Sequence, residues 1–173
     1  MKNLPIPEKI DVIQEGPTTI IRRKWLSWTV IPLLIFCVVW DSFLIFWYKM
    51  AMGDQNAPLM AILFPIGHVS VGIALTYYVI ASFLNKTDVV IAPDQITVRS
   101  YPIPWGFTKS IQREDIMAVR VKMSSQNNSQ MTFGIRYTNR SNREKPLLRS
   151  GLNDDQAEFI VHHIRQALRL PEE

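Results

Sequence analysis

Two side chains that could be charged near neutral pH, Asp41 and His68, interrupt long apolar stretches of the sequence. Asp41 is the only such side chain in residues 25–48, and His68 is the only one in residues 58–84. At about 1.5 Å per helical residue, both lie roughly 10 to 15 Å from the same end of their stretches. A carboxylate and an imidazole at one depth can satisfy each other across two helices, so we expect Asp41 to contact His68.

This intramembrane polar pair has a functional and a structural interpretation. Ionisable residues inside hydrocarbon often mark proton relays, ion pathways or ligand sites. A polar clasp that fixes two helices, or an oligomer contact, needs the same residue types. One chain with two spans cannot line a pathway alone, which favours the clasp. A third possibility is a partner whose polar group pairs with Asp41.

The elements that must position this pair are two membrane helices. The stretches 25–48 and 58–84 contain 24 and 27 residues, and both exceed the roughly 20 residues needed to cross a bilayer as helix. A short connection between them predicts an antiparallel hairpin over residues 25–84. The basic run "RRK" at residues 22–24 precedes the first span, so the positive-inside rule places both the N-terminus and the C-terminus in the cytoplasm.

The rest of the chain changes to a β-type pattern. Residues 85–173 carry 13 Lys and Arg against 10 Asp and Glu, and their short alternating runs, such as "ITVRSY" and "MTFGIRYTN", predict antiparallel strands. Asn153, Asp154, Asp155 and Gln156 predict a capped start for a C-terminal amphipathic helix. The expected fold is membrane α+β: a transmembrane hairpin, then a small antiparallel β-barrel or sheet of pleckstrin-homology-like outline closed by that helix.

Residues 1–24 are expected to form a cytoplasmic N-terminal segment. Its proline and charge content is typical of a flexible lead-in. The short run "TTII" before "RRK" could add a strand to the cytoplasmic domain, which is assigned to residues 85–173.

The segment "TDVVIAPDQITVRSYPIPWGFTKSIQREDIMAVRV" resembles the bacterial pleckstrin-homology-like domains found beside paired membrane helices. The run "RRKWLSWTVIPLLIFCVVWDSFLIFWY" is similar to the first membrane helix of such proteins. The resemblance covers about residues 18–170 and rests on architecture and spacing. It implies a bacterial inner-membrane protein with this fold, and it carries no catalytic signature.

A second resemblance is to the photosystem I assembly factors of plastids and cyanobacteria. Those are short proteins with two N-terminal membrane helices and a soluble C-terminal domain. The stretches "WGF", "EDIMAVRV" and "PLLRSGLNDDQAEFIVHHIRQALRLP" carry this likeness. The membrane spans depart from that family.

No motif in the sequence predicts a reaction. The sequence has no phosphate-cradling glycine loop, no paired Cys or His ligands and no nucleophile elbow. We therefore expect no enzyme activity, no cofactor and no metal site. The basic residues are dispersed, which argues against nucleic acid as a partner.

Six basic residues could still form a surface toward an anionic leaflet or a protein partner. They are Lys109, Arg113, Arg120, Lys122, Arg136 and Arg143. The sequence thus predicts a non-enzymatic membrane-anchored adaptor or assembly factor. Its expected partners are membrane lipids, and a membrane protein or further copies of the chain. The alternatives are a component of an oligomeric transporter or channel that uses Asp41 and His68, and a photosystem assembly factor.

Overall fold

The computed structural model of this chain describes residues 5–53, 58–106, 108–127 and 130–170. Residues 1–4 of the predicted N-terminal segment and 171–173 of the predicted cytoplasmic domain lie outside the described residues. The chain divides into two units. Residues 25–85 form a helical hairpin, and residues 1–24 join residues 86–173 in a β-rich unit.

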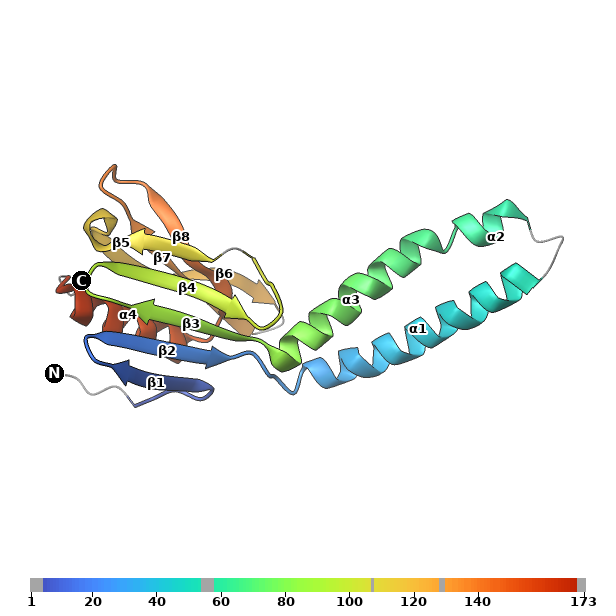
Figure 1. Cartoon of the computed structure of the whole chain (residues 1–173), viewed down its shortest axis with the longest axis horizontal. Coiled ribbons are helices and arrows are strands. Elements are labelled where there is room, and N and C mark those ends of the chain that lie inside the picture. The colour runs from blue at the N-terminus through green and yellow to red at the C-terminus, as the bar shows by residue number, and fades with distance from the viewer. Residues whose placement is uncertain (1–4, 54–57, 107, 128–129, 171–173) are drawn as a thin grey trace. The chain divides into compact units, whose positions relative to one another are not determined.

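The elements follow one another along the chain as Figure 1 shows. They are β1 (Ile10–Glu15), β2 (Thr18–Lys24), α1 (Val30–Gly53), α2 (Leu59–Leu63), α3 (Ile66–Leu84), β3 (Lys86–Ile91), β4 (Gln95–Tyr101), β5 (Lys109–Gln112), a 3-10 turn (Arg113–Asp115), β6 (Ala118–Asn127), β7 (Gln130–Thr138), β8 (Glu144–Leu152) and α4 (Asp154–Leu168).

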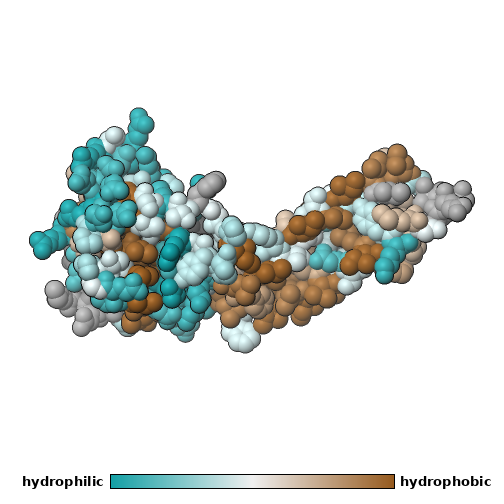
Figure 2. Space-filling view, in the orientation of Figure 1, coloured by the Kyte–Doolittle hydropathy of each residue, from teal (hydrophilic) through white to brown (hydrophobic). Residues whose placement is uncertain are grey.

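The helical hairpin has two segments that are long and apolar enough to cross a membrane, Val30–Gly53 and Leu59–Leu84. Helix α1 begins at Val30 and not at Trp25, with Pro32 in its first turn, where a missing N–H costs nothing. The second segment is interrupted at Pro65, between α2 and α3. Figure 2 shows the hairpin covered largely by hydrophobic residues and the β-rich unit largely by hydrophilic ones.

The β-rich unit contains two antiparallel sheets that do not close into a barrel. One has five strands in the order β1-β2-β3-β4-β5, and the other has three in the order β6-β7-β8. The expected α+β class is therefore confirmed. Of the two predicted forms, barrel or sheet, the structure has open sheets. The residues 1–24 that were expected to form a lead-in supply β1 and β2, and "TTII" lies in β2.

The five-stranded sheet combines strands from both sides of the hairpin in the sequence, β1 and β2 before it and β3, β4 and β5 after it. Lys24 is the last residue of β2 and pairs directly with Lys86, the first residue of β3. The ladder continues one step further, since the Trp25 N–H donates to the Asn85 carbonyl at 3.1 Å. The whole of residues 25–85 thus lies between two paired residues of neighbouring strands.

Helix α4 completes the core of the β-rich unit. It begins with the predicted capping box, in which the Asn153 side chain accepts from the Gln156 N–H at 2.8 Å. Its apolar face, including Ile160 and Ile164, is buried in one cluster with residues of both sheets, such as Ile21 and Ile135. This packing joins α4 and both sheets in one core, and Figure 1 shows α4 beside the strands.

Candidate functional site

Asp41 lies on the side of α1 that faces α3, and its partner there is Thr76. The Thr76 hydroxyl donates to Asp41 Oδ2 at 2.8 Å. Gly72, one turn earlier on α3, gives the carboxylate room, because a Cβ at that position would lie 2.7 Å from Asp41 Oδ1. Sequence and local structure agree here: the glycine permits a close approach, and the threonine supplies a donor.

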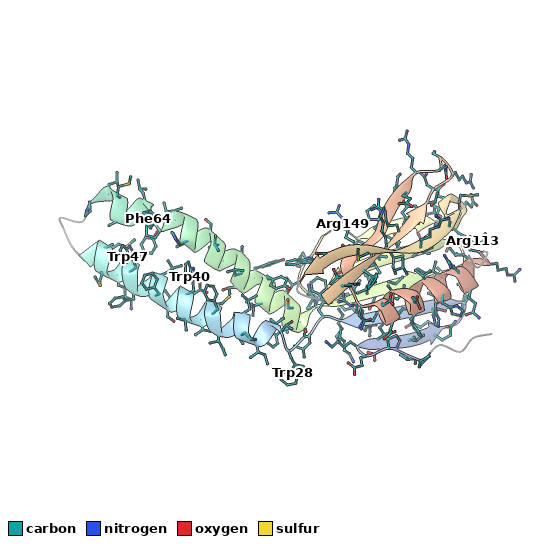
Figure 3. All side chains as sticks on the ribbon, turned by 180° about the vertical axis from the view of Figure 1, so that it is seen from behind. Trp28, Trp40, Trp47, Phe64, Arg113 and Arg149 are labelled. Atoms are coloured by element: carbon teal, nitrogen blue, oxygen red, sulfur yellow. The ribbon has the colours of Figure 1, made fainter. Side chains whose placement is uncertain are left out.

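His68 lies elsewhere in the hairpin. Its ring is in contact with two aromatic rings, with centroid distances of 5.7 Å to Trp40 and 5.2 Å to Phe64. The indole N–H of Trp40 also points at the His68 carbonyl, at 3.4 Å. Trp40 and Phe64 can be followed in Figure 3. The structure therefore does not bring Asp41 and His68 together as the sequence predicted, and each has partners of its own.

Asp41 and His68 lie at different levels because α1 does not end at Tyr48. The helix continues to Gly53, twelve residues beyond Asp41. The second segment begins at Leu59, and twelve residues further along is residue 71, beside Gly72. Counting from the actual ends thus predicts the observed level of Asp41.

The six predicted basic residues are dispersed within the β-rich unit. Lys122 and Arg136 share one acid, Glu144, whose Oε2 lies 3.5 Å from Lys122 Nζ and 3.4 Å from Arg136 Nε. Arg113, seen in Figure 3, donates to the Leu168 carbonyl at 2.9 Å. Arg120 lies on β6 directly opposite Arg136. The structure therefore partly neutralises this set through Glu144.

Arg143 and Lys109 occupy different parts of the unit. Arg143 follows the turn after β7, where its N–H donates to Asn139 Oδ1 at 2.9 Å. Lys109 begins β5 at the edge of the five-stranded sheet, and its ammonium group donates to the Pro146 carbonyl on β8. Lys109 thus lies where the edges of the two sheets approach each other.

Two residues that the sequence analysis left out, Lys145 and Arg149, belong with Lys109. The Lys109 ammonium lies 4.9 Å from the centre of the Tyr137 ring, and Lys145 is the direct cross-strand neighbour of Tyr137. Burial lowers the pKa of Lys109, and the charges of Lys145 and Arg149 lower it further. We call Lys109, Lys145 and Arg149 the basic cluster.

The basic cluster has no acidic counterpart among the described residues. Three carboxylates of the unit are engaged elsewhere: Glu144 on β8 by Lys122 and Arg136, and Glu114 and Asp115 in the 3-10 turn by Arg140, at 3.3 and 3.9 Å. Lys145 and Arg149 are exposed, and Lys109 is half-buried. Three cations that repel one another without a carboxylate form a favourable place for an anion.

A second charged group that sequence reasoning missed lies across β2, β3 and β4. Asp88 is fully buried, and it pairs in register with Arg22 on one side and Arg99 on the other. The Tyr101 hydroxyl donates to Asp88 Oδ2 at 2.9 Å. Both arginines also lie over the Tyr101 ring, at 5.9 and 5.4 Å. This network satisfies its own carboxylate, so we read it as structural.

No group of three or more His, Cys, Asp or Glu side chains within the described parts of the chain could hold a metal ion. The comparisons with known proteins add no further assignment, since neither a protein-family model nor a curated protein matches this chain. The functional argument therefore depends on the basic cluster and on Asp41.

Proposed function

We propose that this protein is a non-enzymatic, membrane-anchored adaptor or assembly factor whose β-rich unit binds the phosphate of an anionic lipid headgroup. In this proposal the hairpin crosses the membrane twice, in a bacterial inner membrane, and both termini lie in the cytoplasm. The pleckstrin-homology-like character of the β-rich unit belongs to the same proposal. The observation that carries it is the basic cluster, Lys109, Lys145 and Arg149, without a carboxylate partner in the described residues.

The chemistry of the cluster suits a phosphate. Ammonium and guanidinium groups bind phosphate oxygens through short, charge-assisted hydrogen bonds, and a guanidinium can donate two in parallel. A bound phosphate would also relieve the repulsion that lowers the pKa of Lys109. Because the unit is tethered to a membrane, a weak affinity for each headgroup is sufficient.

Chain connectivity supports a lipid as the source of the phosphate. Lys109 pairs with Val98 on β4, three residues before Tyr101. Tyr101 in turn pairs with Lys86, the residue at which the chain enters the sheet from the hairpin. Lys109 therefore lies toward the end of the five-stranded sheet at which the chain enters from the hairpin.

The geometry favours this function over a transport role for Asp41 and His68. A proton relay between the two requires a hydrogen-bonded path, and the structure gives Asp41 the Thr76 hydroxyl while the His68 ring contacts Trp40 and Phe64.

Lysine reactivity tests the proposal in the full-length protein. The protein is placed in nanodiscs of phosphatidylcholine alone or with phosphatidylglycerol, and the rate of amine acetylation at each lysine is measured by mass spectrometry. We expect Lys109 and Lys145 to react several-fold more slowly in the phosphatidylglycerol discs. Lys122, which pairs with Glu144, serves as the internal control.

Two variants and one soluble ligand make the outcomes distinct. Arg149→Gln should remove most of the protection, whereas Arg140→Gln, which breaks the contacts of Arg140 with Glu114 and Asp115, should not. If glycerol 3-phosphate protects the lysines and phosphatidylglycerol does not, the ligand is a free phosphate and the lipid proposal fails. A copurifying protein that Arg149→Gln releases would instead assign the cluster to a protein partner. Equal rates under all conditions would refute a phosphate site.

A further inference from the structure

One face of the helical hairpin forms an open groove between α1 and α3, and Asp41 and Thr76 are among the residues that line it. Its volume is about 840 Å³, and apolar side chains such as Ile45 and Ile73 form most of its walls. Ser70 and Tyr77 add hydroxyl groups to the lining, and Lys49, eight residues along α1 from Asp41, is its one Lys or Arg among the described residues. We call this the Asp41 groove. It lies wholly within residues 41–80, in one unit of the chain.

The groove lies beside the packed seam of the hairpin, since the buried residues of α1 are Val30, Cys37, Leu44 and Ala51, and Leu44 also lines the groove. Cys37 on α1 and Val79 on α3 are buried in a small cluster that forms the seam. The walls of the groove remain exposed, with Ile45 at 60% and Ile73 at 66%. Two helices that only face lipid would present the same apolar walls. They would not need a carboxylate among the lining residues.

Asp41 retains hydrogen-bonding capacity that the chain does not use. A carboxylate can accept about four hydrogen bonds, and the described residues supply one, from Thr76. No Lys, Arg or His among the described residues forms an ion pair with it. In apolar surroundings a charged carboxylate without a cation is costly. A ligand with a positive charge beside Asp41 would therefore be bound more tightly than a neutral one.

The size of the groove decides between a small molecule and a helix. Small-molecule sites in proteins measure about 300 to 1,000 Å³, with mostly apolar walls and a few placed polar groups. The Asp41 groove has both properties. Interfaces between transmembrane helices are enriched in small residues that let the backbones approach closely, whereas the groove walls carry Ile45, Ile73 and Tyr77.

We propose that the Asp41 groove binds an apolar primary amine that enters from the lipid phase, with its ammonium group against the Asp41 carboxylate. An ammonium group has three donors and no acceptor. One donor is met by the carboxylate, and the lone pairs of the Ser70 and Thr76 hydroxyls are available to the others. The apolar chain of the ligand lies along Ile45 and Ile73. This inference needs the hairpin to lie in a membrane, as proposed above, but it is independent of the basic cluster.

Photolabelling of the full-length protein in phosphatidylcholine nanodiscs tests this site. The probe is dodecylamine with a diazirine on its chain, and the matched probe is the corresponding dodecanol. We expect the amine to label peptides of α1 and α3 that line the groove, and unlabelled dodecylamine to compete with it. Because a charge-assisted hydrogen bond is lost, Asp41→Asn should lower the competed labelling by roughly tenfold or more.

Control variants separate the groove from simple partition into lipid. Ser42→Ala, one residue away, removes a hydroxyl that donates only to its own helix at Val38 and should label normally. Ser70→Phe leaves Asp41 and Thr76 intact but fills the groove, so it should abolish competed labelling. This variant decides the matter if Asp41→Asn fails to fold.

Three results would overturn the proposal. They are undiminished labelling in Asp41→Asn, undiminished labelling in Ser70→Phe, and equal competed labelling by the alcohol and the amine. Each of them leaves the acetylation of Lys109 and Lys145 unaffected, so failure here is distinguishable from failure of the headgroup proposal.

Discussion

Arg22 and Asp88 form a bidentate ion pair across β2 and β3, with Arg22 Nε 2.9 Å from Asp88 Oδ1 and Arg22 Nη2 3.1 Å from Oδ2. Asp88 is completely buried, whereas the Arg22 side chain is 27% exposed. Removing one partner of a buried pair leaves the other without compensation, at a cost of about 3 to 5 kcal/mol.

Asp88→Asn should therefore destabilise the β-rich unit by about 3 kcal/mol. Hydrogen exchange of the β3 amides in the full-length protein measures this opening free energy directly. The control is Asp11→Asn, which breaks the half-exposed pair with Lys24 at 2.9 Å and should cost about 1 kcal/mol or less. Equal protection of β3 in wild type and Asp88→Asn would show that the pair contributes little.

The same pair should make the β-rich unit sensitive to acid. Burial by itself raises the pKa of Asp88, but hydrogen bonds from Arg22 and Tyr101, with the charges of Arg22 and Arg99, outweigh it and hold this pKa below its usual range. A depressed pKa adds stability above the unfolded value of about 3.9 and loses it as the pH falls below that value toward the folded pKa. We expect the difference in unfolding free energy between wild type and Asp88→Asn to shrink as the pH falls from 5 toward 2. A difference that is constant over that range would contradict this assignment.

The basic cluster makes a prediction about titration. Burial and the charges of Lys145 and Arg149 lower the pKa of Lys109. Arg149→Gln removes one of those charges, so the pKa of Lys109 should rise toward its ordinary value. Nuclear magnetic resonance of ¹³C-methylated lysines would follow the titration, with Arg140→Gln as the variant that should leave it unchanged. An unaltered Lys109 titration in Arg149→Gln would place Arg149 outside the cluster.

Gly134 on β7 allows the β8 backbone to approach closely beside Arg149. A Cβ at position 134 would lie 2.5 Å from the Arg149 carbonyl oxygen and 2.8 Å from that of Leu148. Backbone atoms cannot move aside cheaply, so Gly134→Ala should destabilise the unit by about 1 to 3 kcal/mol. The matched control is Gly67→Ala on α3, where no atom lies within 4 Å of the new methyl group. Thermal unfolding compares the two, and equal effects would refute the close-approach argument.

Local signals in the sequence were sufficient for several elements. The Asn153 to Gln156 capping box involves residues three apart, and it is present as predicted. The alternation in "ITVRSY" gives β4 its buried Ile96 and Val98. The apolar length of the two helical segments likewise needs no tertiary information.

Pairings between distant residues could not be predicted in this way. Strand β1 contacts only β2 within its sheet, and β2 meets β3 across an interval of 61 residues, 25–85. The acidic partner of Arg22 therefore lies 66 positions away. The basic cluster depends on an irregular register between β7 and β8, with shifts on either side of Ile135. No periodicity in "REKPLLRS" indicates such a bulge, so the sequence pattern does not distinguish Lys145 and Arg149 from Lys122 and Arg136.

The pairing of Lys24 with Lys86 means that the helical hairpin takes the place of a single tight turn. Antiparallel neighbours whose last and first residues face each other can be joined by two residues, for which Asn-Gly is favoured. Replacing residues 25–85 by Asn-Gly should thus yield a water-soluble, monomeric globule with unaltered β3 exchange, and aggregation of that miniature would count against it. The hairpin is therefore an insertion at a turn of the five-stranded sheet, whose strand pairing on either side does not include residues of α1, α2 or α3.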